Sequence, residues 1–479
     1  MHPIYPILDE MTTLGKLERL QLGYDNDACS QFQVFMVLAI GAKLLSQRHR
    51  VRLPSESYCR TALQYFHQLN IGDSVQGLQC LLLLQIYTIH CPHMRLNLWY
   101  LNYHCLSVTI DLGLQKDLGS NSGVSHAEQE LRTRIFWVVI TLDRKIAIMM
   151  GRPIGLRDEA CDLRLPKSTG TESGVEIPHD ESRANATITF SAHIFRLTRL
   201  KTEYKYVANS VVRSVPSFAY PEIVDMAEWQ QDLVARIDQW IENIPSTQLK
   251  EQRYLHLIAC TLGLGLKMAA LRPSIANPVW TPGSAGKCQE AAQSVLELYH
   301  HLYRENSLIC SWEAMHSITM ALVTMLCSAR VSTGLCNPAK VACTLDIGLC
   351  LLSICGEHWS AAKRCRDILE NIGRPFVKNL KDLSGGVPSA EVNQEVPSIA
   401  TQASRIVSDQ ATGPTMEDST LRMGEDALVT GYNAANGILD GWLMPEMTTG
   451  DIELETDADF TDTLWRHWFD DVVTTYPTS

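Results

Sequence analysis

Apolar residues recur at helical spacing along this chain, and the most informative stretch runs from Glu128 to Pro166. Its first half, as far as Met149, carries two apolar lines, with Asp143 set among the residues of the second line. Because a helix with two apolar sides must be covered on both, we expect other helices to pack around this one. The first line consists of Leu131, Ile135, Val138, Val139, Leu142, Ile146 and Met149, and the second of Phe136, Ile140 and Ala147.

Both ends of this predicted helix carry recognisable signals. Glu128 and Glu130 lie in its first turns, where the positive end of the helix dipole favours acidic side chains. Gly151 follows the last turn and can adopt a left-handed conformation, and Pro153 prevents the helix from continuing. We therefore expect a helix that ends at Gly151.

The same periodicity predicts helices along the rest of the first 375 residues. No run of alternating β-branched residues bounded by turns indicates a sheet, so the predicted fold class is all-α. Ser74 has the position of an N-cap for the third of these helices. The predicted helices cover residues 32–45, 55–69, 75–90, 94–114, 187–214, 222–244, 254–271, 288–303, 317–333, 341–355 and 361–371.

Composition changes at Ser384, after which Ser, Thr, Gly, Pro and acidic residues predominate to about Asn436. Such a segment has too few large apolar side chains to offset the entropy cost of ordering. We predict a helical body over residues 1–375, a disordered linker over 376–449 and a separate tail over 450–479.

The tail alternates acidic residues with large apolar ones. This composition is typical of disordered activation segments, in which acids keep aromatic side chains solvated. On a transient helix the apolar residues would present one face to a coactivator groove, and this interpretation is favoured. The alternative is a C-terminal helix that docks back on the body. The predicted activation residues are Phe460, Leu464, Trp465, Trp468 and Phe469.

The formal net charge of −12 argues against DNA binding through the bulk surface, since attraction to phosphates needs clustered Lys and Arg. The 15 cysteines include no CxxC pair and are typical of reduced thiols in a nuclear or cytosolic compartment. Leu78 to Ile89 is the most apolar run, and it is too short to cross a bilayer, so no membrane segment is predicted.

Candidate metal and catalytic chemistry is sparse. His90 with His93, and Cys355 with His358, offer two ligands each where a zinc site needs three or four, so no metal ligand is predicted. The sequence contains no GxSxG, P-loop, HExxH or dinucleotide motif. An all-helical enzyme such as a terpene cyclase would need an acidic motif inside a helix, whereas the paired aspartates Asp470 and Asp471 lie in the tail. We predict no catalytic residue, no bound cofactor and no enzymatic activity.

Asp143 is the one anomaly on the central helix. A carboxylate among Phe136, Ile140 and Ala147 is costly unless it is paired, and an arginine of the same motifs, such as Arg152, is a natural partner. Such a pair either fixes the end of the helix or lines a ligand-sensing pocket. We favour the structural role.

Several ordered motifs in this chain resemble the fungal-specific transcription factor domain, the middle homology region of fungal zinc-cluster regulators. The resemblance covers roughly Met1 to Pro375 and departs from the family at Gln115 and Lys116, where His and Arg are commoner. Its central motifs are Phe136-Trp137, Leu142 to Arg144 with Asp143 in the middle, and Gly151-Arg152-Pro153. Further matches are His2 to Leu8, similar to the family's HPxFPIL, Asp111 to Asp117, similar to DLGLHRD, and Trp240 to Pro245, similar to WxxxLP.

The resemblance implies a nuclear transcription regulator that controls a pathway-specific gene cluster, such as one for a secondary metabolite. Its expected partners are the transcription machinery or a coactivator, and a second subunit in a homodimer or heterodimer. In the family the DNA-binding zinc cluster lies upstream of the HPxFPIL segment, so zinc and DNA are expected only through a module not present in this chain. The alternative is an interaction partner or inhibitor of a complete regulator.

Overall fold

The computed structural model describes residues 1–91, 94, 96–118, 123–162, 164–167, 179–208, 225–246, 252–274, 280, 282–332 and 336–384. All regular structure in these residues is helical, which confirms the predicted all-α fold class. The residues from 385 onward lie outside the described part. With them lie most of the predicted linker and the whole tail, including Phe460, Leu464, Trp465, Trp468 and Phe469.

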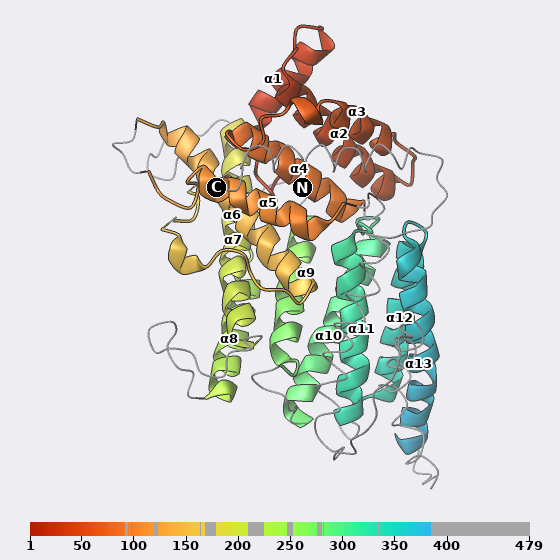
Figure 1. The fold of residues 1–479 in the computed structure, drawn as a ribbon. Helices are drawn as coiled ribbons and strands as arrows, with labels where there is room; N and C mark the ends of the chain where they lie inside the picture. Colours follow the sequence, from red (N-terminus) through yellow and green to blue (C-terminus); the bar gives the residue numbers. More distant parts are fainter. Residues whose placement is uncertain are drawn as a thin grey trace, which may run out of the picture.

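The helices follow one another closely along the chain (Figure 1). They are α1 (Glu10–Gln21), α2 (Ala28–His49), α3 (Ser55–Gln64), η1 (Phe66–Gln68), α4 (Val75–His90), α5 (Leu98–Asp111), α6 (His126–Met149), η3 (Asp158–Ala160), α7 (His179–Ala208), α8 (Met226–Glu242), α9 (Gln252–Leu271), α10 (Pro282–Arg304), α11 (Trp312–Val331), α12 (Pro338–Gly356) and α13 (Ser360–Ser384).

Polar caps set where several of these helices begin. Ser74 accepts a hydrogen bond of 3.0 Å from the backbone N–H of Gly77, as predicted for the start of α4. Ser125 caps α6 in the same way through the N–H of Glu128. These caps satisfy backbone donors that have no partner inside the helix.

The helices enclose two hydrophobic cores. The first core lies among α2 to α8 and the facing side of α9, and the second lies among α9 to α13. In Figure 1, α1 to α5 gather at one end of the molecule, while α10 to α13 stand side by side at the other. Helix α9 contributes to both cores, with Ala269 in the first and Met268 in the second.

Helix α6 is buried on both of its apolar lines, as its sequence pattern predicted. Ile135 and Ile146 on the first line are fully buried, and so is Ala147 on the second. The helix contacts α4, α5 and α7. It therefore occupies the middle of the first core.

Helices α7 and α10 begin at His179 and Pro282, before the predicted residues 187 and 288, and two further helices differ more. Helix α1 was not predicted, because its short sequence has few apolar residues and presents Met11 and Leu14 to solvent. Helix α13 does not end at Asn371 but continues through Pro375 to Ser384. A proline inside a helix removes one hydrogen bond, but burial of Val377 and Leu380 in the second core offsets that loss. Residues 376–384 thus extend the helical body.

Four described helices are long and apolar enough to cross a membrane. The sequence prediction, which considered only the most apolar short run, did not identify them. Between 44% and 67% of each apolar window is buried inside this fold. These helices are apolar because they face neighbouring helices in the two cores. They are Ala28–His49, Gln252–Leu271, Trp312–Val331 and Pro338–Gly356.

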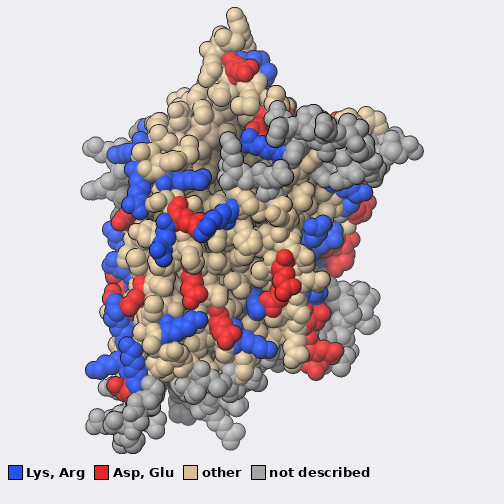
Figure 2. Space-filling view, turned by 180° about the vertical axis from the view of Figure 1, so that it is seen from behind, with Lys and Arg blue, Asp and Glu red and all other residues tan. Residues whose placement is uncertain are grey.

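Charged side chains are mixed on the surface. On the face opposite to that of Figure 1, Lys and Arg alternate with Asp and Glu, separated by wide uncharged areas (Figure 2). No extended basic patch covers the described residues on this face. DNA phosphates would find no concentrated positive charge there.

Candidate functional site

The end of α6 adopts the predicted stop. Gly151 has a φ of +65°, in the left-handed region that favours glycine. The backbone N–H of Arg152 donates to the carbonyl of Ala147 at 2.9 Å, which satisfies a carbonyl in the last turn. Pro153 follows on the surface. The Gly151-Arg152-Pro153 motif therefore turns the chain into a loop that runs back along α6.

Asp143 lies in the middle of α6 and is fully buried. One of its carboxylate oxygens accepts a hydrogen bond of 2.9 Å from the Nδ2 of Asn102 on α5, and the other accepts one of 2.8 Å from the Nη1 of Arg144. The backbone N–H of Gly155 donates to both oxygens, at 3.3 and 3.2 Å. Every face of this buried carboxylate thus meets a donor.

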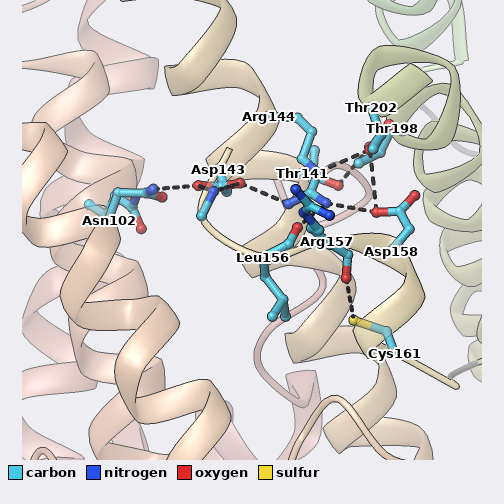
Figure 3. Close-up of polar contacts among 12 residues, drawn as sticks. Asn102, Thr141, Asp143, Arg144, Leu156, Arg157, Asp158, Cys161, Thr198 and Thr202 are labelled. Carbon is cyan, nitrogen blue, oxygen red and sulfur yellow. Dashed lines mark hydrogen bonds and ion pairs between the residues drawn. The ribbon is translucent and has the colours of Figure 1, made fainter. Parts of the chain in front are cut away.

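Arg144 is fully buried as well and is the largest such side chain in the described residues. Its guanidinium donates hydrogen bonds of 2.8 Å to Asp143, 2.7 Å to Oδ1 of Asp158 and 2.5 Å to the carbonyl of Leu156. Its Nε donates to the hydroxyl of Thr202 on α7 at 3.0 Å. Figure 3 shows the guanidinium between Asp143 on one side and Asp158 and Thr202 on the other. One side chain therefore joins α6, α7 and the loop after Gly151.

We call this set the Asp143–Arg144 network. It begins at Gln85 on α4, which donates to Asn102 at 3.0 Å, and so connects four helices and one loop. Burial raises the pKa of Asp143 above its ordinary value, and the charge of Arg144 with the hydrogen bonds from Asn102 and Gly155 opposes that rise. The members are Gln85, Asn102, Asp143, Arg144, Gly155, Leu156, Asp158 and Thr202.

Arg152 is not the partner of Asp143, which corrects the sequence prediction. Its guanidinium lies 4.9 Å from the ring centroid of Trp99 on α5, in a cation–π contact. Arg152 leaves the helix in the turn, whereas Arg144 remains beside the carboxylate inside the core. The ion pair exists as expected, but with a different arginine of the motif.

Phe136 and Trp137 lie on the α7 side of α6. Trp137 stacks on Phe195 with ring centroids 6.0 Å apart, and Arg199 covers it at 5.1 Å. The indole N–H of Trp137 donates to the carbonyl of Arg164 at 2.9 Å. Phe136 meets Trp137 edge-on within the core. This pair joins the helix to α7 and to the loop after Gly151, at Arg164.

Lys145, the next residue of α6, is buried and forms a second ion pair with a partly exposed carboxylate. The Nζ of Lys145 donates to Glu313 on α11 and to the hydroxyl of Tyr5, each at 2.6 Å. Burial alone would lower the pKa of Lys145, but the Glu313 carboxylate and Tyr5 raise it above its ordinary value. Burial likewise opposes the ionised form of Glu313, but Lys145 holds the pKa of Glu313 below its usual range. This pair connects the N-terminal segment, the first core and α11.

No group of three or more His, Cys, Asp and Glu side chains in the described residues could hold a metal ion. Histidine 93 of the HCPH sequence lies outside the described part. The charged clusters that the structure does show are hydrogen-bonded networks inside the core. They support an architectural role for the central motifs.

Sequence reasoning missed several partners in these networks. Asn102 is an amide within an apolar helix, and Lys145 is a cation on a helix that is apolar on both sides. Both are anomalies of the kind that singled out Asp143, so the same criterion would have found them. Asp158 sits in polar surroundings along the sequence, and Glu313 lies in the first turn of a helix, where acidic side chains are ordinary, so neither carries such a signal.

The chain matches a family model described as the fungal specific transcription factor domain over residues 1–242. The match ends at the last residue of α8 and includes the whole Asp143–Arg144 network. No solved structure matches the chain.

Several curated fungal proteins are similar to this chain. Protein STB5 of Saccharomyces cerevisiae is 21% identical over 431 residues, which cover 81% of this chain and 54% of that protein. Pyrimidine pathway regulatory protein 1 of the same yeast is 24% identical, with coverage of 56% and 30%. The pyrrolocin cluster transcription factor fsdR of a fungal species is 24% identical, with coverage of 51% and 33%. The chain thus spans about half the length of these relatives or less.

Proposed function

This chain belongs to the fungal specific transcription factor domain family, and we propose that it is a nuclear transcription regulator that acts through contacts with other proteins and not through catalysis. The observation that carries the proposal is the family match over residues 1–242, which contains the motifs of α6 and the loop after it. Two of the similar proteins named above, the pyrimidine pathway regulatory protein and the pyrrolocin cluster transcription factor, are regulators, which supports it further.

Within this proposal, the helical body through α13 is the regulatory part of the molecule. Residues 385–449 are a linker, and residues 450–479 contact a coactivator or the transcription machinery. The acidic and aromatic composition of the tail supports that division, because such segments bind grooves through a few apolar side chains. The body would also support a homodimer or a heterodimer.

DNA would be reached through a module outside these residues, and zinc would belong to that module. The net charge of −12 and the mixed surface in Figure 2 support this arrangement. No contact with a membrane is proposed, since the apolar helices are used inside the cores. The target is a set of genes of one pathway, by analogy with the pyrimidine pathway regulator and the pyrrolocin cluster factor.

A reporter assay tests the proposal. The whole chain is fused to an unrelated DNA-binding domain and expressed in yeast with a reporter gene under the matching operator. We expect activation that falls at least several-fold when Leu464, Trp465 and Trp468 are replaced by Ala.

The matched control replaces Leu421, Leu428 and Val429 of the linker by Ala, which removes a comparable set of apolar side chains and should leave activation unchanged. A fusion that enters the nucleus, is present at normal levels and neither activates nor represses the reporter would contradict a regulatory role. Equal losses in the two triple variants would contradict the tail as the activating segment.

A further inference from the structure

A cavity of about 110 Å³ lies at the place where the two cores meet. Helix α6 lines it with Lys145 and Met149, and α7 lines it with Lys201. Helices α9, α10 and α11 complete the wall with side chains that include Leu266, Tyr299 and Glu313. The cavity therefore touches both halves of the helical body.

The charges around this cavity do not balance. Lys145, Lys201 and Arg272 line it, while Glu313 is the one carboxylate among the lining residues. Glu313 already accepts from Lys145 at 2.6 Å. The lining residues therefore offer Lys201 no second carboxylate.

Lys201 is the cation that lacks a close anion. No hydrogen bond or ion pair joins its ammonium group to any residue in the described part of the chain, and the residue is only partly exposed. Burial and the charge of Lys145 lower its pKa to about 8, and Glu313 opposes this change. The group therefore stays mainly protonated at neutral pH, and an anion that joins a partly buried cation of this kind stabilises it.

The histidine in the wall does not add to the positive charge. Burial and Arg272 lower the pKa of His316 to about 4, with the backbone of Met149 and the carboxylate of Glu313 opposing them. Its imidazole is neutral at pH 7 and can accept or donate one hydrogen bond. It adds polarity to the cationic end of the cavity.

The remaining lining is largely apolar, formed by Ile148, Met149, Leu262, Leu266, Met268 and Met320. Such a wall favours a hydrocarbon group over a fully hydrated inorganic ion. A cavity of ~150 Å³ lined by apolar side chains holds benzene, so this one suits a molecule of about five or six non-hydrogen atoms.

We propose that this cavity binds a small organic carboxylate. Its carboxylate group pairs with Lys201 and Arg272, and its aliphatic part lies against Leu266 and Met320. The ligand would give Lys201 an anionic partner at the junction of the two cores. If the proposed function holds, this is an effector site within the regulatory body.

Thermal unfolding of the purified full-length chain tests this proposal without any reporter. The probes are butyrate, its neutral analogue butyramide, and inorganic phosphate, each compared with sodium chloride at the same ionic strength. A ligand that binds only the folded state raises the Tm as its concentration rises. We expect a saturable rise with butyrate and no specific rise with butyramide or phosphate.

The decisive variant is Lys201→Met, which keeps the length of the side chain and removes its charge. It should fold at least as well as the wild type, because it removes a partly buried cation that has no ion pair in the described residues, and should bind butyrate about tenfold more weakly or worse. The matched control is Lys267→Met on α9, whose ammonium pairs with Asp238 at 2.7 Å and does not line the cavity. This control should bind butyrate as the wild type does.

Equal responses to butyrate and butyramide would overturn the proposal, as would unchanged butyrate binding by Lys201→Met. A response to phosphate alone would also overturn it, since that result would indicate an inorganic anion site. A protein that fails here and still drives the reporter would leave the proposed regulatory function intact.

Discussion

The two hydrophobic cores differ in what they bury beside apolar side chains. In the described residues, every buried Asp, Glu, Lys and Arg precedes the end of α8, and the second core adds only neutral polar side chains such as Ser328 and Thr344. The charged set is Lys16, Asp25, Glu130, Asp143, Arg144, Lys145 and Lys205. The part of the chain that matches the family model is thus also the part that buries charge.

This difference indicates two ways of fixing a helical body. The second core depends on close packing, which is tolerant of its sequence as long as volume and pattern are kept. The first core adds hydrogen bonds that are satisfied by only one arrangement of α4 to α7 and the loop after Gly151. Recognisable motifs therefore concentrate where particular side chains are required.

The largest expected difference between the two cores is their loss of stability as the pH falls. Burial is the main cause that lowers the pKa of His2 and His193 to about 4 and that of His90 to about 3, and all three lie against the first core. His316 on α11 has a similarly lowered pKa and lies at the junction of the two cores. An unfolded histidine binds protons below a pKa of about 6.5, so the unfolded state takes up more protons than the folded one as the pH falls. Stability should drop from about pH 6.5 towards pH 4.

Hydrogen exchange measured at pH 7.5 and pH 5 would check this expectation. Protection should fall first in α4 and α7 and later in α12. The pKa of Glu313 is depressed in the folded state, so Glu313 should add a further loss of stability only below its unfolded pKa of about 4.5. Simultaneous loss of protection in both cores would remove the contrast between them.

Arg144→Met should cost about 3–5 kcal/mol of unfolding free energy, because it leaves the buried carboxylate of Asp143 without its cation. Urea denaturation followed by circular dichroism would measure the loss. A change below about 1 kcal/mol would be inconsistent with a fully buried pair.

Gly348→Ala probes the second core, where charge plays no part. A Cβ at this position on α12 would collide with the side chain of Leu322 on α11, so we expect a loss of about 1–3 kcal/mol. Gly286→Ala on α10 is the matched control, since its Cβ would meet nothing within 4 Å and should stabilise the helix by about 0.5–1 kcal/mol. Equal effects of the two substitutions on the urea midpoint would disprove close contact between α11 and α12.

Arg152→Met should have the smallest effect, about 0.5–1 kcal/mol, because Arg152 loses only its contact with Trp99. The same urea titration serves as the measurement. A loss as large as that of Arg144→Met would restore Arg152 as the partner that the sequence suggested.

The sequence predicted the placement of α6 well because burial on two sides leaves a direct pattern of apolar residues. It also predicted that Asp143 must be paired, from the cost of an isolated buried charge. It did not identify the partner, because neighbouring residues on a helix point about 100° apart and do not normally face each other. Arg144 reaches Asp143 only because its long side chain bends around the helix towards the loop that carries Asp158.

Contacts between distant segments were beyond prediction for a different reason. Lys145 and Glu313 are 168 residues apart, and nothing in either local sequence specifies the other. The end of α13 was missed because Pro375 is a strong local stop signal, whereas the burial of Val377 and Leu380 depends on the second core. Local rules fail where tertiary packing offsets a local cost.

The most direct test is a double-mutant cycle on Asp143 and Arg144, measured by urea unfolding of Asp143→Leu, Arg144→Met and the combined variant. If the two side chains act as one buried unit, the combined variant should lose about 2–3 kcal/mol less than the sum of the single losses. Losses that add to within about 0.5 kcal/mol would contradict the conclusion that this pair organises the first core.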